Sequence, residues 1–141
     1  MYLVDTNYLS ETRKIERADA NVAAWSRANP LEMMFVSVIT LLEVETGLMR
    51  LARRDPAQAS RLESWLNGVV LPRVSGRILP IDLACARRAA ALHVPNPRPI
   101  HDALIAATAL VHGLTVVTRN TVDFEPMGVP VLNPWSGPAR T

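Results

Sequence analysis

Short runs of β-branched and aromatic residues alternate along this chain with longer segments of helical periodicity, and this alternation constrains the fold more than any other feature. The runs with strand composition cover residues 2–4, 35–38, 78–81, 115–118 and 129–132. Parallel strands need a crossover connection between them, which is usually a helix. We therefore expect an α/β protein, a three-layer α/β/α sandwich around a mostly parallel sheet of four to five strands.

Helical segments are expected at residues 7–14, 21–28, 39–54, 56–70, 82–93 and 99–112. Local signals support several of their boundaries. Pro56 suits the first turn of a helix, Asp82 suits an N-cap and Gly113 suits a left-handed C-cap. No repeat, low-complexity tract or long linker interrupts the sequence, so residues 1–141 are expected to form a single domain.

The composition argues against several classes of protein. The longest apolar stretch, residues 103–111, is much shorter than the ~18 residues that span a bilayer, so no membrane segment is expected. Asp5 lies where a signal peptide would be apolar, which predicts a cytoplasmic location. Cys85 is the only cysteine, which excludes an internal disulfide and a cysteine-rich zinc site.

Four carboxylates lie at or near the ends of the expected strands. Asp5 directly follows the first strand, and Asp123 lies five residues after the fourth. Glu43 lies one turn into the helix after the second strand, and Asp102 lies in the first turn of the last long helix. Because ligands bind outside the carboxyl ends of parallel strands, we expect these side chains to converge there. Such a set suits a hard divalent cation that prefers oxygen ligands.

These acids also have structural interpretations. Glu43 follows Thr40 by three residues, a capping-box spacing, and Asp123 has the same relation to the residue three positions before it. Asp102 suits the positive end of its helix dipole. Asp5 resists such an account, because a carboxylate at the end of a buried strand is costly unless it is paired. Taken together, the four acids favour a metal site.

Polar neighbours are expected to orient the acids. Thr6 and Asn7 directly follow Asp5, and their side chains can bond its oxygens or the backbone amides beyond it. Thr118 and Asn120 lie at the end of the fourth strand and can hold a bound water, although Asn120 equally suits an N-cap. These four residues are the expected supporting set.

Arginine dominates the positive charge, since all but one of the 15 basic residues are arginine. A planar guanidinium suits phosphate, so an arginine-lined groove can lie beside an acidic pocket even at a net charge of +2. Biased composition alone also explains a high arginine content. The candidates for phosphate contacts are Arg13, Arg50, Arg87, Arg88 and Arg119, and the sequence does not choose among them.

Four segments resemble the motifs of VapC-type PIN domains. They are VDTN at residues 4–7, LEVETG at 42–47, DALIAATA at 102–109, and VTRN at 117–120 followed by Asp123 and Phe124. They occur in order and span most of the chain. The resemblance implies a Mg²⁺- or Mn²⁺-dependent endoribonuclease that hydrolyses RNA with a metal-activated water. It also implies the toxin of a type II toxin–antitoxin system, silenced by a VapB-type antitoxin.

The same resemblance assigns roles in the site. Asp5 and Asp102 would be direct metal ligands, and Glu43 would complete the pocket directly or through water. Many PIN domains carry their fourth acid where this chain has Asn120, whereas VapC-like members often carry it where Asp123 lies. We assign Asp123, which leaves open whether one metal or two are bound. The resemblance also implies a homodimer within a larger complex that contacts DNA only through the antitoxin.

Two other functions fit part of the pattern. A Mg²⁺-dependent phosphatase or a receiver-like domain also places acids at parallel strand ends, but such sites need a well-placed lysine, and Lys14 is far from any later strand end. A catalytically idle PIN fold would bind RNA or protein without cutting. The four acids argue against it, because crowded like charges are costly unless a cation uses them. His101 is the only histidine near the expected site, and the spacing of the histidines argues against zinc.

Overall fold

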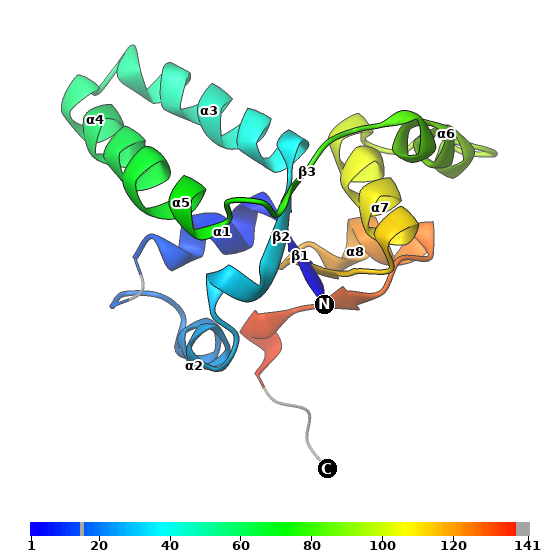
Figure 1. The fold of residues 1–141 in the computed structure, drawn as a ribbon, viewed down its shortest axis with the longest axis horizontal. Helices are drawn as coiled ribbons and strands as arrows, with labels where there is room; N and C mark the ends of the chain where they lie inside the picture. The colour runs from blue at the N-terminus through cyan, green and yellow to red at the C-terminus, as the bar shows by residue number, and fades with distance from the viewer. Residues whose placement is uncertain (15, 138–141) are drawn as a thin grey trace.

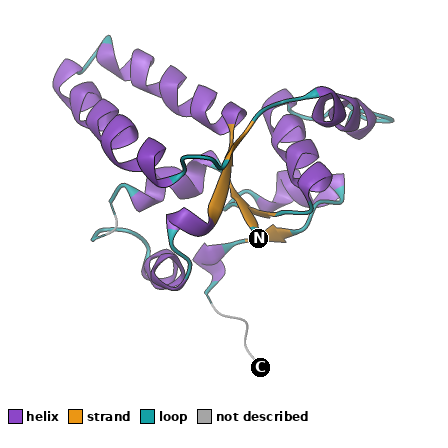
Figure 2. Cartoon of the chain, in the orientation of Figure 1, coloured by secondary structure: helices purple, strands orange, loops and turns teal. Residues whose placement is uncertain are grey.

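The computed structural model describes residues 1–14 and 16–137 and contains a five-stranded sheet with helices on both faces (Figures 1 and 2). The remainder of the expected domain, residue 15 and residues 138–141, lies outside this description. The strands are β1 (Tyr2–Val4), β2 (Met34–Ser37), β3 (Ile78–Leu79), β4 (Thr115–Val117) and β5 (Val131–Leu132). Their order is β3-β2-β1-β4-β5, and every pair is parallel. The expected α/β/α class is confirmed.

The long helices begin and end close to their expected limits. They are α1 (Thr6–Thr12), α2 (Ala20–Ala28), α3 (Val38–Ala52), α4 (Pro56–Trp65), α6 (Leu83–Leu92) and α7 (Ile100–His112). Shorter helical segments are η1 (Leu31–Met33), η2 (Leu66–Val70), α5 (Leu71–Arg73), α8 (Thr121–Phe124), η3 (Glu125–Met127) and η4 (Pro134–Ser136). Within the described part of the chain, none of these helices is long and apolar enough to cross a membrane.

Prolines explain three of the departures from the expected boundaries. The helix expected at residues 56–70 is α-helical only to Trp65 and continues as a π-helical turn, in which Leu71 donates to the carbonyl of Leu66. Pro72 cannot donate a backbone bond, and its ring crowds the carbonyl four residues before it, so the helix widens there. Strands β3 and β5 are also shorter than expected, because Pro80 and Pro130 cannot donate to the ladder.

The core consists of two clusters on opposite faces of the sheet. One contains Val4, Val36 and Val117 and is covered by α1, α2, η2 and part of α3. The other contains Leu3 and Val116 and is covered mainly by α7 and α8. Successive strand residues point to opposite faces, so each strand contributes to both clusters. Figure 1 shows α3 and α4 on one side of the strands and α6 and α7 on the other.

The strand order creates a topological switch point at the centre of the sheet. Strand β1 pairs with β2 on one side and with β4 on the other. The chain therefore moves outward from β1 to β2 and β3, then returns through α6 and α7 to β4. In open parallel sheets, ligands bind outside the carboxyl ends of the strands at such a reversal. Asp5 follows β1 and Thr118 follows β4, so both lie at this position.

Candidate functional site

Asp5 is the only buried acid among the residues that the structure describes, with 6% of its surface exposed. Its Oδ1 accepts a hydrogen bond from the backbone N–H of Thr6 at 2.8 Å and so caps α1. Its Oδ2 accepts from the Thr118 hydroxyl at 2.8 Å and from the Asn7 amide at 3.3 Å. Burial raises the pKa of Asp5 above its ordinary value, although the bonds from Thr118 and Thr6 oppose this effect.

Thr118 connects the ends of β4 and β1. Its side chain is fully buried, and besides donating to Asp5 its hydroxyl accepts from the Asn7 amide at 3.2 Å and from the backbone N–H of Asn120 at 2.9 Å. The Oδ1 of Asn7 in turn accepts from the backbone N–H of Arg119 at 3.2 Å. These bonds fix how the Asp5 carboxylate is presented. The residues expected to support the acids are therefore joined in one network at the switch point.

Glu43 lies on α3 and faces this network. The Thr6 hydroxyl donates to its Oε1 at 2.7 Å, and the Nδ1 of His101 lies 3.5 Å from its Oε2. The capping-box interpretation of Glu43 is wrong, because the N-cap of α3 is Ser37 and not Thr40. The Thr40 hydroxyl is buried and has no hydrogen-bond partner among the described residues. Glu43 is therefore placed by its contacts across the site and not by a cap.

Asp102 lies in the first turn of α7, as expected. Its pKa is raised to about 6, first by burial and then by the negative charges of Asp5, Asp123 and Glu43. The neighbouring His101 opposes this shift. A helix dipole would lower the pKa at this position, so burial and charge repulsion outweigh it. The four expected acids thus share one electrostatic environment.

Asp123 is tied to the site through Asn120. The Asn120 amide donates to Asp123 Oδ2 at 2.7 Å, and its backbone N–H bonds to Thr118. In a capping box, by contrast, the acid accepts from the backbone N–H of the cap residue. Asn120 precedes α8 but its side chain makes no capping bond. The capping-box interpretation of Asp123 is therefore also wrong.

The donor set fits a hard divalent cation. All four acids offer oxygen ligands, and among the described residues the one ion-pair contact to any of them is from His101, which is charged only when protonated. Among those residues, no three acidic, histidine or cysteine side chains are already gathered to hold one ion. Mg²⁺ usually keeps several waters and is held by one or two carboxylates, which suits so open an arrangement. The residues present therefore fit Mg²⁺ or Mn²⁺ better than a metal that needs a closed protein cage.

The sequence reasoning missed the role of Trp135. The guanidinium of Arg119 lies 5.6 Å from the centroid of the Trp135 ring, a cation–π contact. The Trp135 indole N–H donates to Glu11 Oε2 at 3.2 Å, and its carbonyl accepts from Asn21 at 2.9 Å. Trp135 therefore restrains Arg119 beside Thr118. The sequence contained no periodic pattern that could signal this contact, because it joins segments that are far apart in the chain.

Comparisons with known proteins agree with this fold. A model of the PIN domain family matches residues 2–127. The chain is 40% identical to VapC ribonuclease Y4jK of Sinorhizobium fredii, over 96% of this chain and 98% of that protein. It is 36% identical to toxin FitB of Neisseria gonorrhoeae, over 96% and 99%. The crystal structure of FitAcB from the same organism superposes with a TM-score of 0.86 at 35% identity, covering 96% of this chain and 99% of that one. The chain therefore belongs to the PIN-domain family and, within it, to the VapC-type proteins.

Proposed function

We propose that this protein is a divalent-metal-dependent endoribonuclease and the toxin of a type II toxin–antitoxin system. The observation that carries the proposal is the buried Asp5 carboxylate at the switch point of the sheet, held by Thr118 at 2.8 Å and followed by Thr6, which holds Glu43 at 2.7 Å. The raised pKa of Asp102, caused by burial and by the charges of the other three acids, is consistent with it. Such an arrangement is stabilised when a cation occupies it. Relatives that match nearly the full chain are named as a VapC ribonuclease and as a toxin, which supports the same function.

In the proposed site, Asp5 and Asp102 would hold Mg²⁺ or Mn²⁺ directly, and Glu43 and Asp123 would do so directly or through water. The chemistry supplied there would be a more acidic water and compensation of the charge that develops on the phosphodiester. Thr118 holds the orientation of Asp5 through their 2.8 Å bond. Thr6 and Asn120 restrain Glu43 and Asp123 in the same way.

We also propose a VapB-type antitoxin as the partner of this chain. Structures similar to this one include FitAB bound to an IR36 DNA fragment and a toxin–antitoxin complex from Klebsiella pneumoniae. By analogy, this chain would reach DNA only through its antitoxin, as a homodimer within a larger complex. Addition of the purified antitoxin is then expected to suppress cleavage.

The direct test is cleavage of a fluorescent single-stranded RNA by the purified protein. Mg²⁺ or Mn²⁺ should support cleavage, EDTA should abolish it, and Asp5→Asn should remove it while the circular dichroism spectrum is retained. Undiminished cleavage by Asp5→Asn would reject the site. A catalytically idle fold would instead bind RNA and cut it with neither metal.

A matched pair of variants on α3 sharpens this test. Glu43→Gln removes a carboxylate that contacts Thr6 and His101. Glu45→Gln makes the same change two residues away, where a helical side chain points elsewhere. Cleavage should fall at least about tenfold in Glu43→Gln, by analogy with the loss of groups that support a metal site, and remain nearly unchanged in Glu45→Gln.

A further inference from the structure

A groove of about 270 Å³ leads away from the acidic site between α1, α3 and α4. Helices α1 and α3 both begin at the carboxyl edge of the sheet, so Thr6 and Glu43 mark the end of the groove next to the site. Arg13, Lys14 and Arg54 line it near the ends of the same two helices. Figure 1 shows α3 and α4 side by side, extending away from the strands. The groove therefore joins the acidic pocket to a basic region.

The basic end of the groove has cations available for a ligand. Within the described part of the chain, Arg13, Lys14 and Arg54 form no ion pair with an acid. A neighbouring hollow is lined by Arg13 and Lys14 again, together with Arg17, Gln58 and a single acid, Glu16. Positive charge thus continues beyond the groove. An anionic polymer that enters the acidic site, where the cation offsets the acids, would meet complementary charge along this path.

The walls of the groove suit nucleotide bases. Leu51, Leu62 and the half-buried Trp65 line it between the acidic and basic ends. Proteins that bind single strands combine a basic groove, which follows the backbone, with aromatic side chains on which bases stack. Apolar walls beside a basic region therefore favour a single strand, whose bases are free to stack.

The helical rise gives the length of the path. From Thr6 to Arg13 along α1 is about 10 Å, and from Glu43 to Arg54 along α3 is about 16 Å, at 1.5 Å per residue. A stacked strand advances about 3.4 Å per nucleotide, so these distances correspond to about three to five nucleotides.

We propose that this groove binds the single-stranded RNA that flanks the scissile phosphate. Arg13, Lys14 and Arg54 contact phosphates about three to five nucleotides from the cleaved bond, as the helical rise requires. Trp65 stacks on a base between them. This inference rests on the proposed ribonuclease function and names the part of the substrate that the groove recognises.

Gly47 offers a position at which the groove can be tested without disturbing the fold. It is exposed, it lines the groove, and a Cβ placed on it would meet no atom within 4 Å. A glycine inside a helix is less favourable than alanine by about 1 kcal/mol, so replacing it should not destabilise α3. Gly47→Glu and Gly47→Gln add side chains of nearly equal shape that differ in charge.

The first measurement is binding of a fluorescent single-stranded RNA of about 12 nucleotides to the full chain, in EDTA, by fluorescence anisotropy. Gly47→Glu should weaken binding at least about fivefold more than Gly47→Gln, because its carboxylate repels the phosphates. Arg54→Gln should reduce the slope of log affinity against log salt by about 0.7, the value for one lost phosphate contact. Arg53→Gln is the matched control, because Arg53 does not line the groove, and it should leave the slope unchanged.

The second measurement is cleavage in Mg²⁺ or Mn²⁺. Arg54→Gln should raise KM and leave kcat unchanged on a long RNA, and should have no effect on a substrate with only two nucleotides on each side of the cleaved bond. If the protein cuts no RNA, the proposed function fails. The anisotropy measurement still tests whether RNA binds in the groove.

Other outcomes would overturn the assignment of the groove. Equal binding by Gly47→Glu and Gly47→Gln, or an unchanged salt slope in Arg54→Gln, would show that RNA does not use it. If these variants lost only their affinity for the purified antitoxin, the groove would be a protein-docking site and the RNA proposal would be wrong.

Discussion

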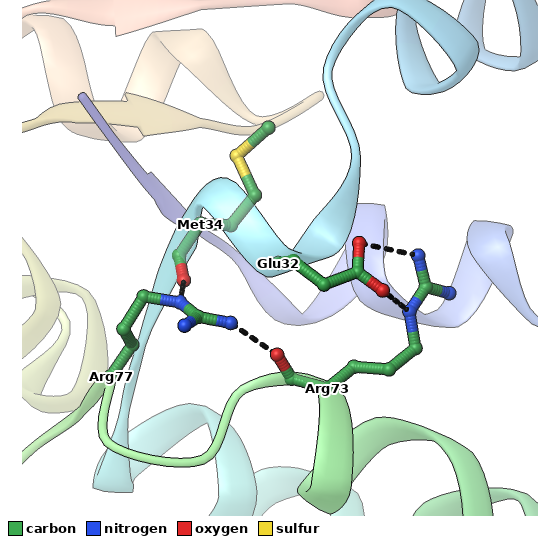
Figure 3. A network of polar contacts seen from close by, with 4 residues as sticks. All are labelled: Glu32, Met34, Arg73 and Arg77. Carbon is green, nitrogen blue, oxygen red and sulfur yellow. Dashed lines mark hydrogen bonds and ion pairs between the residues drawn. The ribbon is translucent and has the colours of Figure 1, made fainter.

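The two ends of the parallel sheet differ in how their charged side chains are paired. At the amino end, Arg73 pairs with Glu32 at 2.6 Å, and Arg77 donates to the carbonyl of Met34 at 2.9 Å and to that of Arg73 (Figure 3). The hydrogen bond from Arg73 lowers the pKa of Glu32. Glu32, Arg73 and Arg77 thus each have a partner supplied by the fold itself.

At the carboxyl end, the fold gathers acids and supplies little positive charge. The pKa of Asp102 is raised to about 6 by burial and neighbouring acids, and burial raises that of Asp5. The comparison indicates that the charges at the amino end are paired within the fold, whereas the acids at the carboxyl end remain available for the proposed cation. Variants that disturb each end should therefore differ in their effects on stability, metal response and cleavage.

The largest effect on stability is expected from Thr118→Val. Valine keeps the shape of threonine but removes the donor to Asp5 and the acceptor for Asn7 and for the Asn120 backbone. Leaving such buried groups unpaired should lower the free energy of unfolding by about 2–3 kcal/mol. Cleavage should fall about 10–100-fold, as for other groups that orient metal ligands. Urea denaturation and steady-state kinetics measure the two losses.

Thr40→Val provides the control for that substitution. Thr40 is equally buried, but its hydroxyl has no hydrogen-bond partner among the described residues. The same change should therefore leave stability unchanged or raise it by about 1 kcal/mol, because it removes a buried polar group without leaving a partner unpaired. Similar losses in the two variants would contradict the role given to Thr118.

The next largest effect is expected from the metal. At about ten times its dissociation constant, Mg²⁺ or Mn²⁺ should stabilise the folded chain by about 1.4 kcal/mol through preferential binding. Thermal denaturation should then show an increase in Tm of several degrees. Asp102→Asn should remove this increase, whereas Arg73→Gln, at the other end of the sheet, should retain it. An equal response in both variants would remove the distinction between the ends.

The prediction that the four acids lie near one edge of the sheet depended only on topology. Strands that alternate with helices run parallel, and their carboxyl ends share an edge, so Asp5, Asp102 and Asp123 could be placed together without coordinates. The interactions of Glu43 could not be predicted in this way. They depend on where β2 ends, because the helix begins directly after it and its N-cap is Ser37, three residues before Thr40.

Other features depend on how helices lie against each other. Among the arginines considered for phosphate contacts, Arg13 lines the groove because α1 packs beside α3 and α4, and Arg54 was not among the candidates. The cation–π contact of Arg119 with Trp135 likewise joins segments that are distant in the chain. Periodicity reports which face of a helix is buried, but not which neighbour covers it.

A smaller effect should appear in the pH dependence of stability in EDTA. The folded protein keeps the Asp102 proton up to about pH 6, whereas the unfolded chain loses it near the ordinary pKa of about 4. Stability from this group is present below about pH 4 and is lost as the pH rises through about 6. Asp102→Asn should match the wild type at pH 4 and exceed it by about 1 kcal/mol at pH 7, because solvent screens this half-buried group. If Asp102→Asn and the wild type were equally stable at both pH 4 and pH 7, the crowding of negative charge around Asp102 would be contradicted.

The smallest effect is expected from Glu32→Gln at the amino end. Both side chains of its ion pair are largely exposed, 42% for Arg73 and 54% for Glu32, so the pair should contribute less than about 1 kcal/mol. The lowered pKa of Glu32 makes this contribution present at neutral pH and lost as the pH falls through that pKa, opposite in sign to Asp102. Urea denaturation at pH 7 and pH 3 measures it. Metal-induced stabilisation and cleavage should not change in Glu32→Gln. A change in either would mean that the two ends of the sheet are coupled.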